Sequence, residues 1–130
     1  MHDMPLLCFN KATDPSAPDD LRINPAAVLY VEASRPDQIG QAIIHLLGQG
    51  TSVNAVTQST ATVVSAIGGL VSATRHYLAP PPDDRVSTVY FAPGNISHVR
   101  PNLPAAPDFW YVRFVDGSEL RIVDPLPAGL

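Results

Sequence analysis

Short apolar runs bounded by turn-forming residues mark both the beginning and the end of the chain. They lie at residues 5–10, 27–32, 86–92 and 96–100 and are rich in aliphatic and aromatic side chains. Asn24-Pro25 precedes the second run, and Pro93-Gly94-Asn95 separates the last two. Runs of this length between turn signals are typical of β-strands. The pattern therefore predicts a β-rich body built from both ends of the chain.

The apolar runs at residues 109–114 and 118–123 predict a β-hairpin with a defined register. A two-residue Asp116-Gly117 turn would place Phe114 opposite Glu119 and would mix apolar and charged side chains on one face. A three-residue loop over residues 115–117 instead places Arg113 opposite Glu119 and gathers the apolar side chains on the other face. We therefore expect the three-residue loop, with Gly117 left-handed in a bulge.

The middle of the chain carries apolar residues at helical spacing. One helix is predicted to begin near Pro36, to place Ile39, Ile43, Leu46 and Leu47 on one side, and to end at the glycines of residues 48–50. A second helix is predicted over residues 52–78, because its larger apolar residues fall on one stripe. Its β-branched residues and the glycines at 68–69 are poor helix formers, so a break or kink is expected there.

These elements predict an α+β fold in a single domain spanning residues 1–130. A small, mostly antiparallel β-sheet would come from about residues 4–33 and 86–124 and would include the C-terminal β-hairpin. A helical hairpin would be inserted at about residues 36–79. The chain length fits one domain of ordinary size.

Residues 38–74 contain no Asp, Glu, Lys or Arg. A soluble surface normally mixes charges of both signs, so this neutral stretch is expected to be covered by other protein. Because the rest of the chain is small, another subunit is a natural candidate. The formal net charge of −4 and the singly scattered basic residues argue against nucleic-acid binding, which usually needs clustered Lys and Arg.

No motif for catalysis, metal binding or nucleotide binding stands out. His45 and His76 could meet between the predicted helices, but a zinc site needs further ligands, and that region has no Cys, Asp or Glu. We therefore predict no metal, cofactor or small-molecule substrate. Cys8 stands in an apolar run and is interpreted as a core thiol. The N-terminus lacks a signal-peptide pattern and no run is long enough for a membrane span, so the predicted location is the cytoplasm or a virion.

Two sets of residues are candidates for a protein interface. The first is a ridge of small residues spaced four apart on the predicted second helix, which would allow close helix packing; it consists of Ala61, Ser65, Gly69 and Ala73. Its partner could equally be the other helix of the same chain. The second is one face of the strand at 109–114 and its hairpin partner, where Tyr and Arg are typical of interfaces; it consists of Phe109, Tyr111, Arg113 and Arg121. The alternative is a sheet face partly covered by the helices.

Residues 21–32 and 114–120 resemble phrases that recur in small bacterial and phage β proteins. The resemblance covers turn and strand segments only, and it implies no function and no site residues. Taken together, the sequence predicts a non-enzymatic structural subunit of a larger repeated assembly, such as a head, tail or connector component of a bacteriophage virion. The partners would be copies of the chain, a larger protein assembly, or both.

The alternative is a small regulatory or adaptor domain that binds one protein partner through its aromatic strand, with Trp110 as an anchor. The third class is an enzyme. It would need a deep pocket in which His45, His76 or His98 meets an Asp.

Overall fold

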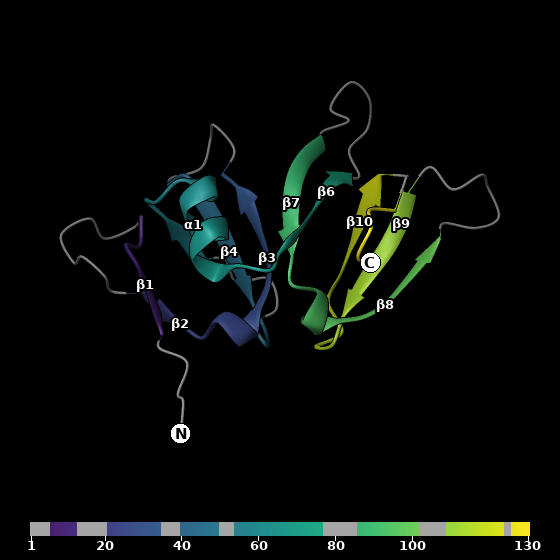
Figure 1. The fold of residues 1–130 in the computed structure, drawn as a ribbon, viewed down its shortest axis with the longest axis horizontal. Coiled ribbons are helices and arrows are strands. Elements are labelled where there is room, and N and C mark those ends of the chain that lie inside the picture. Colours follow the sequence, from purple (N-terminus) through teal and green to yellow (C-terminus); the bar gives the residue numbers. More distant parts are fainter. Residues whose placement is uncertain are drawn as a thin grey trace.

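The computed structural model of the chain describes residues 6–12, 21–34, 40–49, 54–76, 86–101, 109–123 and 126–130. These residues form a predominantly β fold with one α-helix and two short 3-10 helices (Figure 1). In chain order the elements are β1 (Leu7–Phe9), β2 (Leu21–Ile23), η1 (Pro25–Ala27), β3 (Val28–Ala33), β4 (Ala42–Leu46), β5 (Asn54–Val56), α1 (Thr60–Ile67), β6 (Val71–His76), β7 (Val86–Phe91), η2 (Pro93–Asn95), β8 (Ile96–Pro101), β9 (Phe109–Phe114) and β10 (Glu119–Val123).

The strands form one large antiparallel sheet and one small sheet. The large sheet has the order β5-β4-β3-β7-β6-β10-β9-β8, and β1 pairs with β2 in the small one. An isolated bridge between Lys11 and Val56 continues β1 beside β5. Figure 1 shows β1 to β4 with α1 in one group and β6 to β10 in a second group beside it.

The same strand pairings occur twice along the chain. The first repeat consists of β1 to β5 with α1, and the second repeat consists of β6 to β10 with residues 126–130. β1–β2, β3–β4 and β4–β5 pair as β6–β7, β8–β9 and β9–β10 do. The bridge from Lys11 to Val56 matches the one between Arg75 and Ile122. Both repeats also place a proline-initiated 3-10 helix and a register shift at the start of the third strand.

Matching registers give pairs of equivalent positions. Tyr30 pairs with His45 as His98 pairs with Arg113, and Glu32 pairs with Ile43 as Arg100 pairs with Tyr111. His98 therefore occupies the position of Tyr30, and Arg100 occupies the position of Glu32. Lys11 likewise corresponds to Arg75. These correspondences show which residue of one repeat takes the position of a given residue in the other repeat.

Each repeat has its own apolar core. The first core contains Val28, Val31, Ile44 and Val63, which are fully buried. Equivalent strand positions fill the second core, which is built around Phe91, Phe114, Val112 and Ile122. Burying apolar side chains on this scale is the main stabilising contribution to such a fold.

The repeats join head to tail through β3 and β7. Tyr30, Val31 and Glu32 pair with Phe91, Tyr90 and Val89 in antiparallel register. The Tyr30 side chain leaves the first repeat and enters the second core, where its ring stacks on Phe114 at a centroid distance of 5.5 Å. The third strand of the first repeat thus completes the second.

The predicted helical hairpin at 36–79 is wrong. Within the described residues the segment holds two strands, a short helix and a third strand. Ala42, Ile43 and Ile44 are all buried because the strand β4 is covered on both faces. A short run of that kind has no alternation by which to distinguish it from a buried helix.

The helix predicted over residues 52–78 is also wrong, for a different reason. Ser59 caps the amino end of α1, and Gly68 and Gly69 end it with φ angles of 76° and 70°. The break expected at the glycines is therefore a complete end. Beyond it Val71, Ala73 and Arg75 face one way and Ser72 and Thr74 the other, as in a strand.

The strands predicted at the two ends of the chain are confirmed in β1, β3, β7 and β8. The hairpin register is confirmed as well, because Arg113 lies opposite Glu119 and Val112 opposite Leu120. Gly117 has a φ of 91°, as the bulge requires. The interpretation of Cys8 as a core thiol is wrong, because Leu7 and Phe9 turn toward the first core and leave Cys8 exposed.

Candidate functional site

The strand β8 forms the last position of the large sheet, and its start is fixed by contacts between the repeats. The Asn95 side-chain amide donates hydrogen bonds to the backbone oxygens of Ala26 and Val28, at 2.8 and 2.7 Å. These bonds attach η2 to the first repeat. The second edge of β8 pairs with no strand among the described residues.

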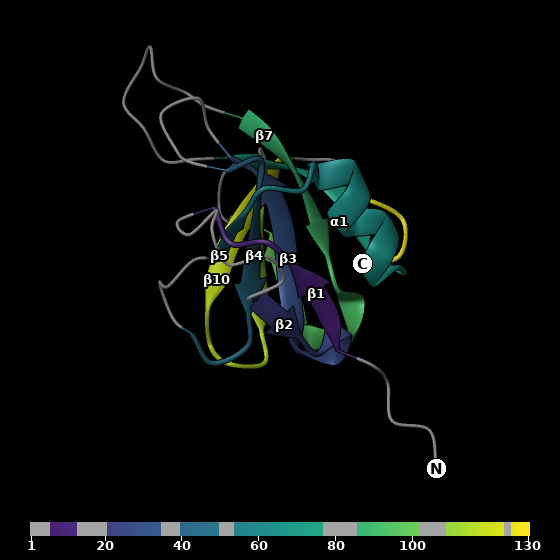
Figure 2. The same ribbon diagram turned by 90° about the vertical axis from the view of Figure 1, so that its left-hand side faces the viewer.

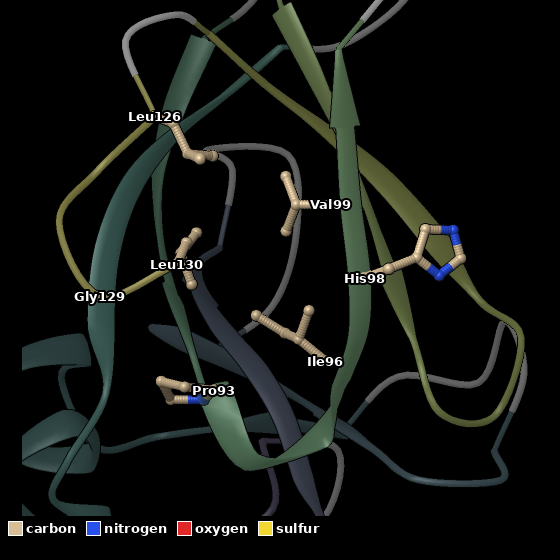
Figure 3. A pocket seen from close by; sticks show the side chains of 7 residues that line it. All are labelled: Pro93, Ile96, His98, Val99, Leu126, Gly129 and Leu130. Carbon is tan, nitrogen blue, oxygen red and sulfur yellow. The ribbon is translucent and has the colours of Figure 1, made fainter.

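The inner side of β8, which faces the second core, borders an apolar pocket of about 410 Å³. The lining residues are Pro93, Ile96, His98, Val99, Leu126, Gly129 and Leu130. Figure 3 shows the side chains of Ile96, Val99, Leu126 and Leu130 pointing into this space, whereas His98 points away from it. The side chains that point into the pocket are therefore aliphatic.

In the first repeat the equivalent position is occupied by α1. The fully buried Val63 packs with Val28 and Val31, which correspond to Ile96 and Val99. In the second repeat residues 126–130 form a turn there, with Leu130 donating a hydrogen bond to the Pro127 oxygen. Figure 2 shows α1 and this C-terminal segment on the same side of the sheet. The pocket is thus the part of the space equivalent to that of α1 that residues 126–130 do not fill.

The outer side of β8, β9 and β10 carries a basic face, defined here as His98, Arg100, Tyr111, Arg113, Arg121 and Glu119. The Arg100 guanidinium lies 4.1 Å from the centre of the Tyr111 ring and 3.2 Å from a Glu119 oxygen. Arg113 approaches the same carboxylate at 3.8 Å. The Arg100 and Arg113 side chains are 50% and 47% exposed, so both remain accessible to a partner.

The equivalent face of the first repeat is buried in the junction between the repeats. Glu32, at 6% exposure, accepts hydrogen bonds from Arg75 through both carboxylate oxygens, at 3.1 and 3.2 Å. His45 Nε2 lies 3.0 Å from the Glu32 carboxylate, and the His45 ring stacks on Tyr30 at 4.0 Å. Arg75 also lies over the Tyr30 ring, at 5.7 Å. This ion-pair cluster aligns β3 against β6 and β7.

The hairpin turn at one end of the basic face holds a second contact between the repeats. Asp116 accepts hydrogen bonds from the backbone and hydroxyl of Ser118, at 2.9 and 2.6 Å, and from the Gly48 backbone at 3.1 Å. Slight desolvation acts to raise the pKa of Asp116, but these hydrogen bonds outweigh it and lower the pKa below its ordinary value. The carboxylate therefore stays ionised to lower pH than a free aspartate.

The predicted ridge of small residues does not exist as one surface. Ala61 and Ser65 are exposed on α1, whereas Gly69 lies beyond the end of the helix. Ala73 lies on β6 and packs against the second core. A spacing of four aligns residues only within one helix, and the helix ends at Ile67.

The second predicted set is brought to one face. Tyr111, Arg113 and Arg121 share the outer side of the hairpin. The backbone of Phe109 continues the same strand, and its side chain lies outside the described part of the chain. Whether this face binds a partner stays a prediction. Trp110, the predicted anchor of the adaptor alternative, instead turns inward and packs against the second core.

Sequence reasoning missed His98 and Arg100 as members of this face. Their signal was present in the alternation of Ser97-His98-Val99-Arg100, but joining them to Tyr111 requires the β8–β9 pairing. The cluster of Glu32, His45 and Arg75 was also missed, because a helix was predicted where β4 and β6 lie.

The described residues contain no group of three or more metal-ligating side chains. His45 meets a glutamate rather than an aspartate, and it does so inside the junction between the repeats. No helix in the described ranges has the length and apolarity to cross a membrane. No known protein family, curated protein or solved structure matches the chain.

Proposed function

We propose that the chain is a non-enzymatic protein-binding subunit of a larger assembly and that it contacts its partner at β8 and β9. One observation carries the proposal. The surface that β3 and β4 bury against the second repeat recurs on β8 and β9, where Arg100 and Arg113 are about half exposed. Among the described residues β8 has one unpaired edge, and such an edge beside aromatic and arginine side chains is typical of a protein-binding surface.

The neutral stretch at 38–74 supports the proposal less than its sequence suggested. Ala42, Ile43 and Ile44 are buried by the chain itself, as are Val56 and Val63. These five side chains are therefore covered by the same molecule, whereas Ala61, Thr62, Ser65 and Ala66 on α1 are exposed and uncharged. A virion remains the predicted example of such an assembly, and the argument for a partner now rests on β8 and β9.

The proposal is tested by light scattering on the purified chain, alone and mixed with the products of neighbouring genes. We expect a complex whose mass exceeds that of the chain. In a Cys8→Ser background, a bulky maleimide attached through Ser97→Cys blocks the complex, because Ser97 is exposed on β8. The matched control attaches the same group through Ser65→Cys on the exposed side of α1.

The labelling and mass measurements together identify the interface and the type of complex. Loss of the complex only with the Ser65 label would move the interface to α1. A chain that remains monomeric at high concentration, binds no hydrophobic dye and forms no complex with any neighbour product contradicts the proposal. A complex of one chain with one partner favours the adaptor alternative, whereas a larger repeating stoichiometry favours the structural subunit.

A further inference from the structure

The strand β3 indicates what would bind at the edge of β8 that pairs with no described strand. Both strands follow a 3-10 helix, share a register shift and pair with the next strand in the same way. The other edge of β3 is occupied by the antiparallel strand β7, through the pairs Tyr30–Phe91, Val31–Tyr90 and Glu32–Val89. An extended strand is therefore the occupant for which the backbone of this edge is suited.

The charge at the position of Glu32 is reversed in the second repeat, where Arg100 takes its place. Glu32 on β3 meets the cation Arg75. Arg100 on β8 stands at the equivalent position, and Arg113 lies across from His98 beside it. Stacking on Tyr111 holds the Arg100 guanidinium at the surface. In the first repeat the guanidinium reaches Glu32 from β6, one strand beyond β7. A single strand at the β8 edge would lie closer, and its residue at the Val89 position would stand directly opposite Arg100. Arg100 already contacts Glu119 at 3.2 Å, and a carboxylate at that position would add a second anion to the half-exposed guanidinium.

The β2 strand of a second copy of the chain does not meet this requirement. If β2 of another copy paired with β8 as β7 pairs with β3, it would place Leu21 opposite Arg100. Its Lys11, the equivalent of Arg75, would then face Arg100. Lys11 and Arg100 would then repel each other at the position where Arg75 and Glu32 form an ion pair in the junction. This repulsion opposes self-association through this edge.

We propose that the β8 edge binds an extended segment of a different protein, antiparallel to β8, with an acidic residue opposite Arg100. This inference rests on the proposed function and names the chemistry of the partner. A nucleic acid is the less favoured anion, because it cannot continue a backbone ladder and because Glu119 lies within the basic face.

The test uses two fluorescein-labelled peptides with the sequence of residues 86–93, which contains the β7 strand. One peptide carries Val89→Glu and the other Val89→Lys, so they differ only at the position opposite Arg100. Fluorescence anisotropy with the full chain is expected to show at least about tenfold tighter binding of the glutamate peptide. In NMR spectra of the chain, the backbone amide shifts that change on peptide binding are expected to concentrate in residues 96–100.

Two variants of the chain locate the contact. Arg100→Glu is expected to reverse the preference in favour of the lysine peptide. Arg22→Glu is the matched control, because Arg22 is also an exposed arginine in the middle of a strand, on β2. It is expected to change the affinity for either peptide by less than about twofold.

Three results would overturn the inference. They are equal affinity for the two peptides, no binding of either up to about 1 mM, and tighter binding of a single-stranded oligonucleotide than of the glutamate peptide. The proposed function fails separately. A complex with a neighbour product that forms equally well with Arg100→Glu preserves the protein-binding function and refutes only the acidic partner.

Discussion

The Tyr30→Ala substitution tests whether the two repeats are joined head to tail or form independent folds. Tyr30 belongs to the first repeat by sequence, but its ring fills the second core. It is 8% exposed, stacks on His45 and Phe114, and lies 6.3 Å from Phe91. The equivalent residue, His98, is exposed on β8 and points away from the pocket (Figure 3).

The expected loss of unfolding free energy follows from how deeply each of the two side chains is buried. Removing a buried aromatic ring typically costs about 3–5 kcal/mol of unfolding free energy, including the stacking that is lost. Small domains have about 5–15 kcal/mol in total, so Tyr30→Ala removes a large share. His98→Ala, at an exposed position, is expected to change the unfolding free energy by no more than about 0.5 kcal/mol. One pair of equivalent residues should therefore show two very different costs.

Urea unfolding monitored by tryptophan fluorescence and circular dichroism measures both variants. With an m-value of about 2 kcal/mol/M, the Tyr30→Ala midpoint falls by roughly 2 M. Tyr30→Phe keeps the ring and loses only the hydroxyl, which lies 3.5 Å from Arg75, so it should cost about 1 kcal/mol or less. Similar costs for Tyr30→Ala and His98→Ala would refute the placement of Tyr30 in the second core.

Three further perturbations test the junction and the turns. Glu32→Gln should lower the unfolding free energy by about 1–3 kcal/mol because it breaks a buried ion pair, whereas Glu119→Gln, in an exposed pair, should change it by less than about 1 kcal/mol; urea titration measures both. Gly40→Ala should lower the melting temperature more than Gly48→Ala. Both glycines have positive φ, but an added Cβ at Gly40 would approach a backbone oxygen at 2.8 Å, and at Gly48 it meets nothing within 4 Å. The lowered pKa of Asp116 stabilises the fold above the pKa of the unfolded chain, and that contribution is lost as pH falls through the folded pKa. The difference in melting temperature between the wild type and Asp116→Asn should therefore shrink from about pH 6 to about pH 2, and a constant difference would contradict the assigned hydrogen bonds.

The sequence by itself determined the local β-structure. Turn residues and short alternating runs located β3, β7 and β8, and segregation of apolar from charged side chains selected the register of the final hairpin. These features depend on residues close together in the chain, because a one-residue slip would move every side chain to the wrong face. For the same reason Tyr111, Arg113 and Arg121 were placed correctly on one face.

Only the tertiary structure decided the nature of the middle of the chain and the location of the site. The strand β4 is buried on both faces, so its apolar pattern alone allows a helix as well as a strand. The pairing of β3 with β7 brings Glu32 to Arg75 and leaves the equivalent Arg100 exposed on β8. Strand order joins residues far apart in the chain, and no local periodicity records that β3 pairs on both edges whereas β8 pairs with only one of the described strands.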